Sequence, residues 1–421
     1  MTTQQPEEAP ATAVDAPDTL DTPNTPVALD ASDAMQLRRD LLEVLCRGAV
    51  HLSPAVERAL LAVPRHLFVP GVPLRDAYAD IAIPTHWEDG VPVSSASQPA
   101  IVALMLEQLR VEPGMRVLEV GAGTGYNAAL LAELAGPHGR VVTLDIDAEI
   151  VAEARAHLDA AGYTGVRAIA ADGAAGWPAE AHYDRIILTA SASDLTPAWL
   201  DQLAEGGLLV LPLWLGGAEM SVALRKEGDT LRSESLTPCG FMRLRGAEAG
   251  DERRATLPGG RQLFADGAQH LAGPIAELLA TRPRKRFIVP PSHAFLQYLG
   301  MQGHSVVSIY TNTDAASPRR VRGRHGIFVA GSDGRGSLAL VAASRPMLLS
   351  FGGGEAEDLL TQAESRAREA LLPLEAWHIS AYPRAVAAAF APSAGVVRLV
   401  RRHFTFDVDM RAPSAPVPAS S

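Results

Sequence analysis

Short apolar runs alternate with segments of helical period through the first half of the chain. The runs with the length and composition of buried strands are 116–120, 140–144, 166–170, 185–189 and 208–213. The segments whose apolar residues recur at helical spacing are 126–135, 148–161 and 199–203. Strands that alternate with helices are typical of α/β proteins, so the pattern predicts a doubly wound, mostly parallel sheet.

The flanks of this region have a different pattern. Residues 35–69 predict two helices that precede the sheet, and residues 1–34, which are acidic and rich in Pro and Ala, predict a disordered tail. The last residues, 412–421, are rich in Pro, Ala and Ser and predict a second disordered tail. We expect the first domain to span residues 35–246.

A weaker pattern after residue 246 predicts a second, smaller α/β domain over residues 247–411. Its expected strands are 287–289, 305–310, 326–330, 338–342 and 347–351. One long helix is expected at 355–372, with acids early and arginines later. A length of 421 residues agrees with two domains plus tails.

Composition and charge exclude several classes of protein. No apolar run reaches the length of a membrane span, and the two cysteines, Cys46 and Cys239, are too few for a disulfide framework. We therefore expect a cytoplasmic protein without a membrane partner, with Cys46 packed on the apolar side of a helix. The net charge of −11 disfavours nucleic acid as a partner. The twelve histidines are scattered without ligand spacing, so no metal site is expected.

Three glycines follow the first strand of the predicted sheet. Gly121, Gly123 and Gly125 form a G-x-G-x-G turn between that strand and a helix, and Glu119 precedes them. Such a turn lets the backbone approach a ligand closely. Tyr126 stands where a dinucleotide fingerprint would need glycine, so the spacing favours S-adenosylmethionine over a nicotinamide or flavin nucleotide.

Acidic residues at neighbouring strand ends fit the same ligand. Asp145 is placed to accept the ribose hydroxyls, and Asp172, followed by Gly173, is placed near the adenine amino group. Glu119 would favour a cationic sulfonium or amino group electrostatically. The alternative for each acid is a cap on the next helix, a role that Asp often has.

The glycine loop lies within a longer set of motifs. These are Val63-Pro64-Arg65-His66-Leu67-Phe68-Val69-Pro70, Ala77-Tyr78-Ala79-Asp80-Ile81-Ala82-Ile83-Pro84, Ser97-Gln98-Pro99 and Asp172-Gly173-Ala174-Ala175-Gly176-Trp177-Pro178. In order and spacing they resemble the protein-L-isoaspartate O-methyltransferase family over residues 37 to about 215. The resemblance implies a class I methyltransferase fold and methyl transfer from S-adenosylmethionine, with S-adenosylhomocysteine as product, to an aspartyl or isoaspartyl carboxylate.

The chain departs from the family pattern in two places. The connection at 85–96 resembles the family's substrate-recognition segment but is about five residues longer. The chain also continues for roughly 170 residues after the sheet. These features resemble a specialised branch of aspartate methyltransferases that act on ribosomally made, modified peptides such as lanthipeptides and graspetides. The expected substrate is then a modified precursor peptide whose methylated Asp closes to aspartimide and can hydrolyse to isoaspartate.

By resemblance, Ser97 lies nearest the reaction and orients the substrate carboxylate, a role that Ser94 and Ser95 can share or replace. The alternative for Ser97 is an N-cap on the helix that begins near Pro99. Four more residues are expected to contact the substrate: Tyr78, Asp80, His86 and Trp87. Core packing is the alternative for Tyr78, and simple exposure is the alternative for His86.

Two basic stretches lie in the second domain, at 282–286 and 319–324. They are expected to be solvated loops or, as a sharper hypothesis, to capture an acidic segment of the peptide. Two other functions remain open beside the expected one: a general isoaspartyl repair enzyme with an accessory domain, and a peptide-binding scaffold without turnover. The sequence leaves the oligomeric state open.

Overall fold

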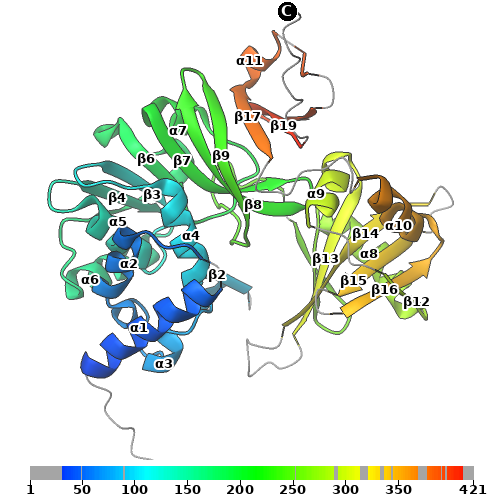
Figure 1. Ribbon diagram of the computed structural model, residues 1–421, viewed down its shortest axis with the longest axis horizontal. Helices are drawn as coiled ribbons and strands as arrows, with labels where there is room; N and C mark the ends of the chain where they lie inside the picture. The colour runs from blue at the N-terminus through cyan, green and yellow to red at the C-terminus, as the bar shows by residue number, and fades with distance from the viewer. Residues whose placement is uncertain are drawn as a thin grey trace, which may run out of the picture.

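The computed structural model describes residues 31–48, 50–88, 91–251, 253–288, 293–312, 321–331, 336–342, 345–367, 377–389, 391–393 and 396–410. Two sheets dominate it, one of ten strands and one of seven (Figure 1). Residues 1–30 of the predicted tail at 1–34, and the whole predicted tail at 412–421, lie outside the described residues. No helix in the described ranges is long and apolar enough to cross a membrane.

The first sheet has a parallel half with the predicted strands. These are β3 (Arg116–Val120), β4 (Arg140–Asp145), β5 (Arg167–Ala170), β6 (Tyr183–Leu188) and β7 (Leu203–Leu215). They lie side by side in the order β7-β6-β3-β4-β5, all parallel. This order reverses between β6 and β4, with β3 at the switch point, and ligand sites form at the carboxyl ends of strands there.

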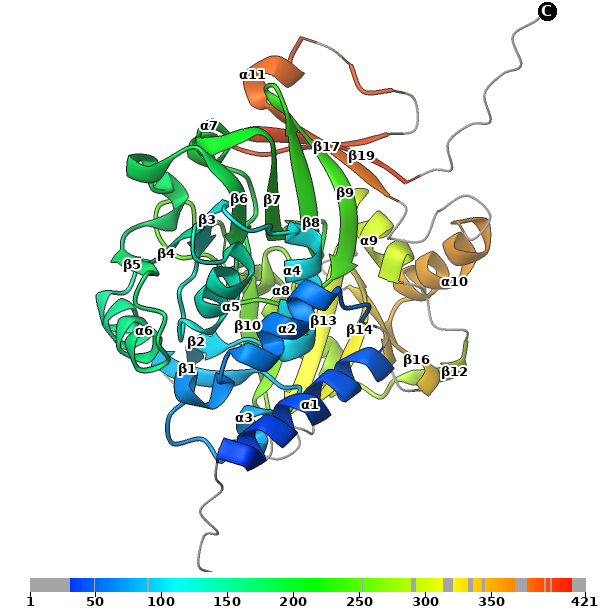
Figure 2. The same ribbon diagram turned by 60° about the vertical axis from the view of Figure 1, so that its left-hand side comes forward.

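Helices cover both faces of this half, because successive strand residues point to opposite sides. One face packs against α1 (Ala31–Arg47), α2 (Pro54–Ala62), α4 (Pro99–Leu109), α5 (Tyr126–Ala135) and α6 (Ala148–Ala160). The other face packs against α7 (Pro197–Gln202), in a core shared with side chains from the antiparallel strands of the same sheet. Helix α2 lies beside α5 and α4, and α1 lies beside α2 (Figure 2). Helix α1 begins at Ala31, inside the stretch expected to be a tail, and Cys46 in this helix is exposed rather than packed.

The other half of the sheet is antiparallel, which the prediction of a mostly parallel sheet did not foresee. Its strands are β8 (Ala218–Glu227), β9 (Thr230–Pro238), β17 (His378–Pro383), β18 (Val397–Val400) and β19 (Phe404–Asp409). Short turns join β7, β8 and β9, and such hairpins force antiparallel pairing. The short helix α11 (Arg384–Ala387) follows β17.

The C-terminal strands correct the predicted boundary of 247–411 for the second domain. Ser380 and Ala381 of β17 pair with β9, so β17, β18 and β19 extend the first sheet (Figure 1). Phe404 and Phe406 of β19 are buried in the same core as β6 and β7. The chain returns to the first sheet because β17 covers the open edge of β9 and apolar side chains find that core. The second domain is therefore an insertion between β9 and β17.

The inserted domain is a seven-stranded antiparallel sheet with three helices. Its strands, in spatial order, are β10 (Arg254–Leu257), β11 (Arg261–Phe264), β13 (Ser305–Asn312), β14 (Val321–Val329), β15 (Ser337–Ala342), β16 (Arg345–Gly352) and β12 (Arg284–Phe287). Helix α8 (Ala268–Ala280) packs on one face, and α9 (His293–Met301) and α10 (Glu355–Ala367) pack on part of the other. Four expected strands and the first part of the expected long helix are confirmed; residues 368–372 lie outside the described residues.

The inserted domain packs closely on the turn between β7 and β8. A Cβ atom on Gly300 of α9 would overlap the carbonyl oxygen of Gly216, so the two backbones touch. Gln297 Nε2 donates to Leu215 O, and Trp214 Nε1 donates to Asp266 Oδ1 at 2.6 Å. These contacts fix the second sheet relative to the first.

Candidate functional site

A cleft of about 1340 Å³ lies between the two sheets, at the carboxyl ends of β3 and β4. Its lining comes from the glycine loop, from the hairpin of β1 (Ile83–Glu88) and β2 (Val91–Ala96), from the segment after β9, and from β10, β11, β13 and β14 of the inserted domain. The connection expected as a loop at 85–96 is thus largely a β-hairpin. The cleft brings together residues as far apart in the sequence as Ala82 and His325.

The glycine loop forms one side of the cleft. Gly121 has φ +105°, and a Cβ atom there would overlap Thr189 Oγ1, so only glycine fits. The N–H groups of Gly121 and Ala122 donate to Leu144 O at 2.7 and 2.9 Å, which ties the loop to β4. Gly123 lines the cleft, whereas Gly125 packs against Ala154 in α6 and is not part of the lining.

Asp145 ends β4 beside this loop and lines the cleft. Its carboxylate accepts hydrogen bonds from Gly123 N at 3.3 Å and Asp147 N at 3.2 Å. The cap of α6 is Asp147 rather than Asp145, so the capping alternative does not apply to Asp145. The next residue, Ile146, is 41% exposed and also lines the cleft, which offers an apolar surface beside the carboxylate.

Asp172 follows β5, but it lies outside the cleft lining. Its carboxylate accepts hydrogen bonds from Ala174 N at 2.9 Å and Ala247 N at 2.8 Å. It therefore caps the short helix η2 (Gly173–Ala175), as the alternative interpretation had it, and it holds the segment after β9 against the sheet. Gly173 itself lines the cleft, and a Cβ atom there would overlap Val120.

Glu119 is the most deeply buried acid of the cleft, with 0% of its surface exposed. One carboxylate oxygen accepts from Asn127 Nδ2 at 2.8 Å and the other from Thr143 Oγ1 at 2.6 Å. Burial raises the pKa of Glu119 to about 7, although these two hydrogen bonds oppose the shift. The carboxyl group is thus poised between its charged and neutral forms near neutral pH, and a nearby cation would favour the charged form.

The three serines of the predicted reaction centre all line the cleft. Ser94 and Ser95 lie in β2, and the Ser95 carbonyl oxygen lies close over Gly123. Ser97 follows β2, and its carbonyl oxygen accepts a hydrogen bond from Arg65 Nη2 at 2.9 Å. The N-cap position of α4 belongs to Gln98, so the alternative of Ser97 as the cap does not hold.

Tyr78 and Asp80 lie behind this segment instead of in the cleft lining. The Tyr78 hydroxyl accepts from Arg38 Nε at 3.1 Å and bonds with His66 Nδ1 at 2.7 Å, and the ring is buried, as the packing alternative had it. Asp80 accepts from Gln98 Nε2 and from Ala100 N, both at 2.9 Å. Asp80 therefore supports the Ser97 segment from outside, whereas Tyr78 is part of the core.

His86 and Trp87 lie on the hairpin but also outside the cleft lining. His86 Nε2 lies 3.4 Å from Glu153 Oε2 of α6. Trp87 is 59% exposed. The hairpin contributes Glu88, Pro92, Val93 and the serines to the cleft instead.

Sequence reasoning missed a group of arginines. Arg65, fully buried, donates to Ala77 O and Ser97 O and stacks over the Tyr126 ring, with its guanidinium carbon 4.8 Å from the ring centroid. Arg65 was visible in the Val63–Pro70 motif. Arg245 lies after β9 and contacts Glu88 at 3.2 Å and Asp145 at 3.5 Å, so it joins the hairpin to the β4 edge. No sequence pattern predicted that Arg245 would contact Glu88 and Asp145.

The residues of the cleft fit S-adenosylmethionine. Gly121 and Gly123 have no Cβ atom, so a ligand can approach the backbone closely there. Asp145 offers carboxylate oxygens at the end of β4, and the buried carboxyl group of Glu119 suits a cation. Across the residues that the structure describes, no group of three or more His, Cys, Asp or Glu is placed to hold a metal ion.

Comparisons with known proteins agree with this geometry. The family model described as "Protein-L-isoaspartate(D-aspartate) O-methyltransferase" matches residues 35–249. A protein-L-isoaspartate O-methyltransferase of Hyperthermus butylicus is 39% identical over 220 residues, which cover 50% of this chain and 89% of that protein. One of Methanoregula boonei is 41% identical over 211 residues, covering 50% of this chain and 93% of the relative.

A solved structure titled "protein-L-isoaspartate O-methyltransferase" aligns over 82% of this chain and 96% of its own, with 24% identity and a TM-score of 0.48. The match of the family model with half of the chain and the coverage of the relatives carry the assignment. The chain belongs to the protein-L-isoaspartate O-methyltransferase family, enzymes with the S-adenosylmethionine-dependent methyltransferase fold.

Proposed function

We propose that the protein methylates the free carboxylate of an isoaspartyl residue in a peptide or protein. The observation that carries this proposal is that Ser97 and Asp145, from separate motifs, line one cleft beside Gly121 and Gly123. S-adenosylmethionine bound there supplies the electrophilic methyl group. Membership of the family, whose curated relatives bear this activity as their name, supports the choice of substrate.

The chain's task in this reaction is to position the acceptor. A carboxylate has an ordinary pKa near ~4, so it is already a nucleophile at neutral pH and needs no general base. Hydroxyl groups of Ser94, Ser95 and Ser97 donate hydrogen bonds that hold one carboxylate oxygen while the other faces the methyl donor. The hairpin that carries Ser94 and Ser95 covers the glycine loop at Gly123 and limits the access of water.

The ester that forms is a better electrophile than the carboxylate. The backbone nitrogen of the neighbouring residue attacks the ester carbonyl carbon, a C–N bond forms, and methoxide leaves with the amide proton as methanol. The product is a five-membered succinimide. This step needs no residue of the protein, and a substrate that holds nitrogen near ester accelerates it.

A second candidate substrate is an Asp side chain of a ribosomally made, modified peptide. The observation that favours it is the inserted domain, whose strands line the cleft opposite the cofactor side. A cleft closed on that side suits a short or ring-constrained peptide better than an arbitrary surface of a large protein. In this case the products are aspartimide and, after hydrolysis, isoaspartate.

Mass spectrometry of matched peptides separates the two candidates. Linear peptides with isoAsp or Asp at one position, and a cyclised version of the Asp peptide, are incubated with S-adenosylmethionine and followed for gain of a methyl group and loss of methanol. Turnover of the linear isoAsp peptide supports the first candidate, and turnover of the cyclic Asp peptide alone supports the second.

Two variants serve as controls for this experiment. Asp145→Ala should abolish methylation, and Asp159→Ala, an exposed acid of α6, should leave it unchanged. Cofactor binding without turnover of any of the peptides would contradict both candidates and favour the peptide-binding scaffold.

A further inference from the structure

One face of the inserted sheet is only partly covered by helices. Val306 of β13 and Ile327 of β14 pair on this face and are buried with residues of α9 and α10. Two positions further along the same strands, Ser308 pairs with His325, and both line the cleft. The face therefore leaves its helical cover and continues as the side of the cleft opposite the glycine loop.

Strand pairing arranges the side chains on this open face in two rows. Arg254, Phe264, Ser308 and His325 are directly opposite one another across β10, β11, β13 and β14. Gln262 and Tyr310 are paired in the next row. Residues directly opposite each other share a face, and residues two apart on a strand share it too. We call these six cleft-lining residues the acceptor wall: Arg254, Gln262, Phe264, Ser308, Tyr310 and His325.

The opposite face explains why the acceptor wall has this composition. Ala255, Leu263 and Ile309 alternate with the wall residues and are buried in the core against α8. The apolar positions of these strands thus stabilise the domain, and the wall positions are not needed for that core. Polar and aromatic side chains at a half-buried position beside a reaction cleft are free to serve recognition.

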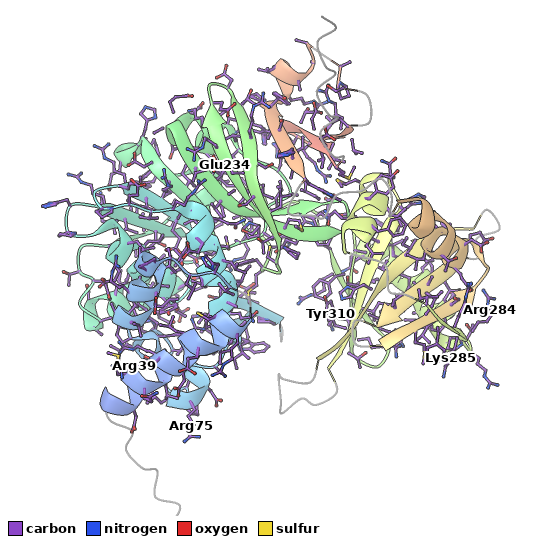
Figure 3. All side chains as sticks on the ribbon, viewed as in Figure 1. Arg39, Arg75, Glu234, Arg284, Lys285 and Tyr310 are labelled. Atoms are coloured by element: carbon purple, nitrogen blue, oxygen red, sulfur yellow. The ribbon has the colours of Figure 1, made fainter. Side chains whose placement is uncertain are left out.

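The acceptor wall is an ordered platform. The Tyr310 ring packs edge-on against Phe264, with centroids 5.5 Å apart, and against His325, with centroids 5.7 Å apart. Ser308 Oγ bonds with His325 Nδ1 at 2.8 Å. Burial raises the pKa of Tyr310, so its hydroxyl stays neutral. Figure 3 shows Tyr310 on the side of the inserted domain that faces the first domain, far from Arg284 and Lys285 at the other edge.

The charges in the cleft favour an acidic ligand. Burial raises the pKa of both Glu119 and Glu219, and the charge of Arg253 opposes this shift at Glu219. The acids Glu88 and Asp145 are both paired with Arg245. The lining contains three further arginines: Arg243, Arg253 and Arg254. Of the described acids in the lining, Glu88 and Asp145 contact Arg245 and Glu119 is bonded to Asn127 and Thr143, so these three arginines share the rest of the lining with Glu219 alone.

We propose that the acceptor wall binds an acidic peptide segment that flanks the methylated carboxylate, and that Arg254 and Tyr310 set the specificity of the enzyme for it. Arg254 pairs with an acidic side chain of the segment, and the Tyr310 ring packs on the neighbouring peptide residue. Because the side chains are already ordered, binding costs little conformational entropy. The inference rests on the proposed function, since it places the methyl acceptor between the glycine loop and the wall.

The test compares two isoAsp peptides that differ only in the flanking residues, Glu on both sides or Lys on both sides. Binding is measured by fluorescence anisotropy with S-adenosylhomocysteine present, and turnover by methyl transfer. We expect the wild-type protein to bind the Glu-flanked peptide at least about tenfold more tightly. Tyr310→Ala should weaken that binding about tenfold with the maximal rate little changed, and Arg254→Glu should reverse the preference.

Two controls separate local effects from misfolding. Lys285→Glu, on the exposed outer strand of the same domain, should leave both affinities unchanged. Tyr310→Phe, which keeps the ring contacts, should retain most of the affinity. All variants should bind S-adenosylhomocysteine as the wild type does.

The two measurements can fail independently. Equal binding of both peptides by the wild type, or unchanged binding in Tyr310→Ala and Arg254→Glu, would overturn the acceptor wall while methylation stands. Selective binding without methylation of either peptide would leave the wall in place and remove the isoaspartyl substrate.

Discussion

The cofactor side of the cleft and the acceptor wall differ in what fixes their residues. On the cofactor side, Gly121 and Asp145 are held by the backbone of adjacent parallel strands, and a Cβ atom at Gly121 would not fit. On the acceptor wall, Tyr310 and Arg254 are side chains on the face of an antiparallel sheet, and other side chains would fit the same backbone. The first arrangement demands particular residues for geometric reasons, whereas the second permits variation and so suits a role in specificity.

The largest effect is expected from Gly121→Ala. The new methyl group would overlap Thr189 Oγ1 at φ +105°, so the loop must move away from the position that approaches the cofactor. We expect the affinity for S-adenosylhomocysteine, measured by calorimetry, to fall at least about hundredfold, because both the clash and the strained φ act against the native loop.

A matched control isolates the clash in Gly121→Ala. Gly162 also has a positive φ, +88°, but no heavy atom within 4 Å would meet its Cβ. Gly162→Ala should cost about 1–2 kcal/mol of stability and leave cofactor binding intact. Equal cofactor affinity in the two variants would contradict the view that backbone geometry fixes this side of the cleft.

A second large effect is expected from Gly300→Ala, which acts on the acceptor side. Its methyl group would overlap the Gly216 carbonyl oxygen and push the inserted domain away from the β7–β8 turn. The acceptor wall then loses its position, while the glycine loop keeps its own. We expect the KM for a peptide substrate to rise about tenfold or more, with the cofactor Kd unchanged.

Gly273→Ala is the control for that experiment, since Gly273 also lies in a helix of the inserted domain but would meet no neighbour within 4 Å. It should leave the KM for the peptide unchanged and change the stability by at most ~1 kcal/mol, because Pro274 restricts the preceding residue and so opposes the helix preference of alanine. If Gly300→Ala leaves the KM for the peptide unchanged, the inserted domain has no part in acceptor binding.

The same difference between the two sides explains how far the sequence could predict this structure. Strands β3 and β4, helix α5 and the glycine loop were predicted nearly residue for residue, because strand period, caps and glycine spacing are local. The acceptor wall was not predicted, since it depends on the pairing of strands about seventy positions apart, such as β10 and β14, through β11 and β13.

Long-range pairing also caused the errors in the predicted site and domains. The Asp172 carboxylate accepts from Ala174 N and also from Ala247 N, which lies far along the chain, and β17 joins β9 across the whole inserted domain. Tyr78 and Asp80 belong to a motif that builds the site from behind, so the motif alone could not separate support from contact.

A smaller effect, dependent on pH, is expected from Glu119→Gln. The native carboxyl group has a pKa raised to about 7 by burial, against 4.5 for the ordinary group. Between these values the native state holds a proton that the unfolded state has lost, so the free energy of unfolding decreases as the pH rises through this window. Glutamine cannot titrate, and it can accept from Asn127 while donating to Thr143 Oγ1.

Urea unfolding of the protein without cofactor, at pH 5 and pH 8, measures this contribution. The variant should be more stable than the wild type at pH 8 by ~2–3 kcal/mol and should lack that part of the pH dependence. Glu149→Gln, an exposed position in α6, should follow the wild type. Parallel pH profiles for Glu119→Gln and the wild type would show that Glu119 is not the titrating group.

The smallest effect is expected from Arg245→Ala, at the residue that joins the two sides of the cleft. Arg245 lies 3.2 Å from Glu88 and 3.5 Å from Asp145, so it competes for the carboxylate that we assign to the ribose hydroxyls. Partly exposed ion pairs of this kind contribute at most about 1 kcal/mol. Its removal should therefore tighten cofactor binding about threefold, and the difference should shrink at high salt as screening weakens the competing pair.

The hairpin should at the same time lose its contact with the β4 edge through Arg245, which predicts a modestly higher KM for the peptide. Weaker cofactor binding in Arg245→Ala would mean that the guanidinium holds the cofactor itself. The cofactor side of the cleft would then depend on a side chain from the segment after β9, and not on backbone geometry alone.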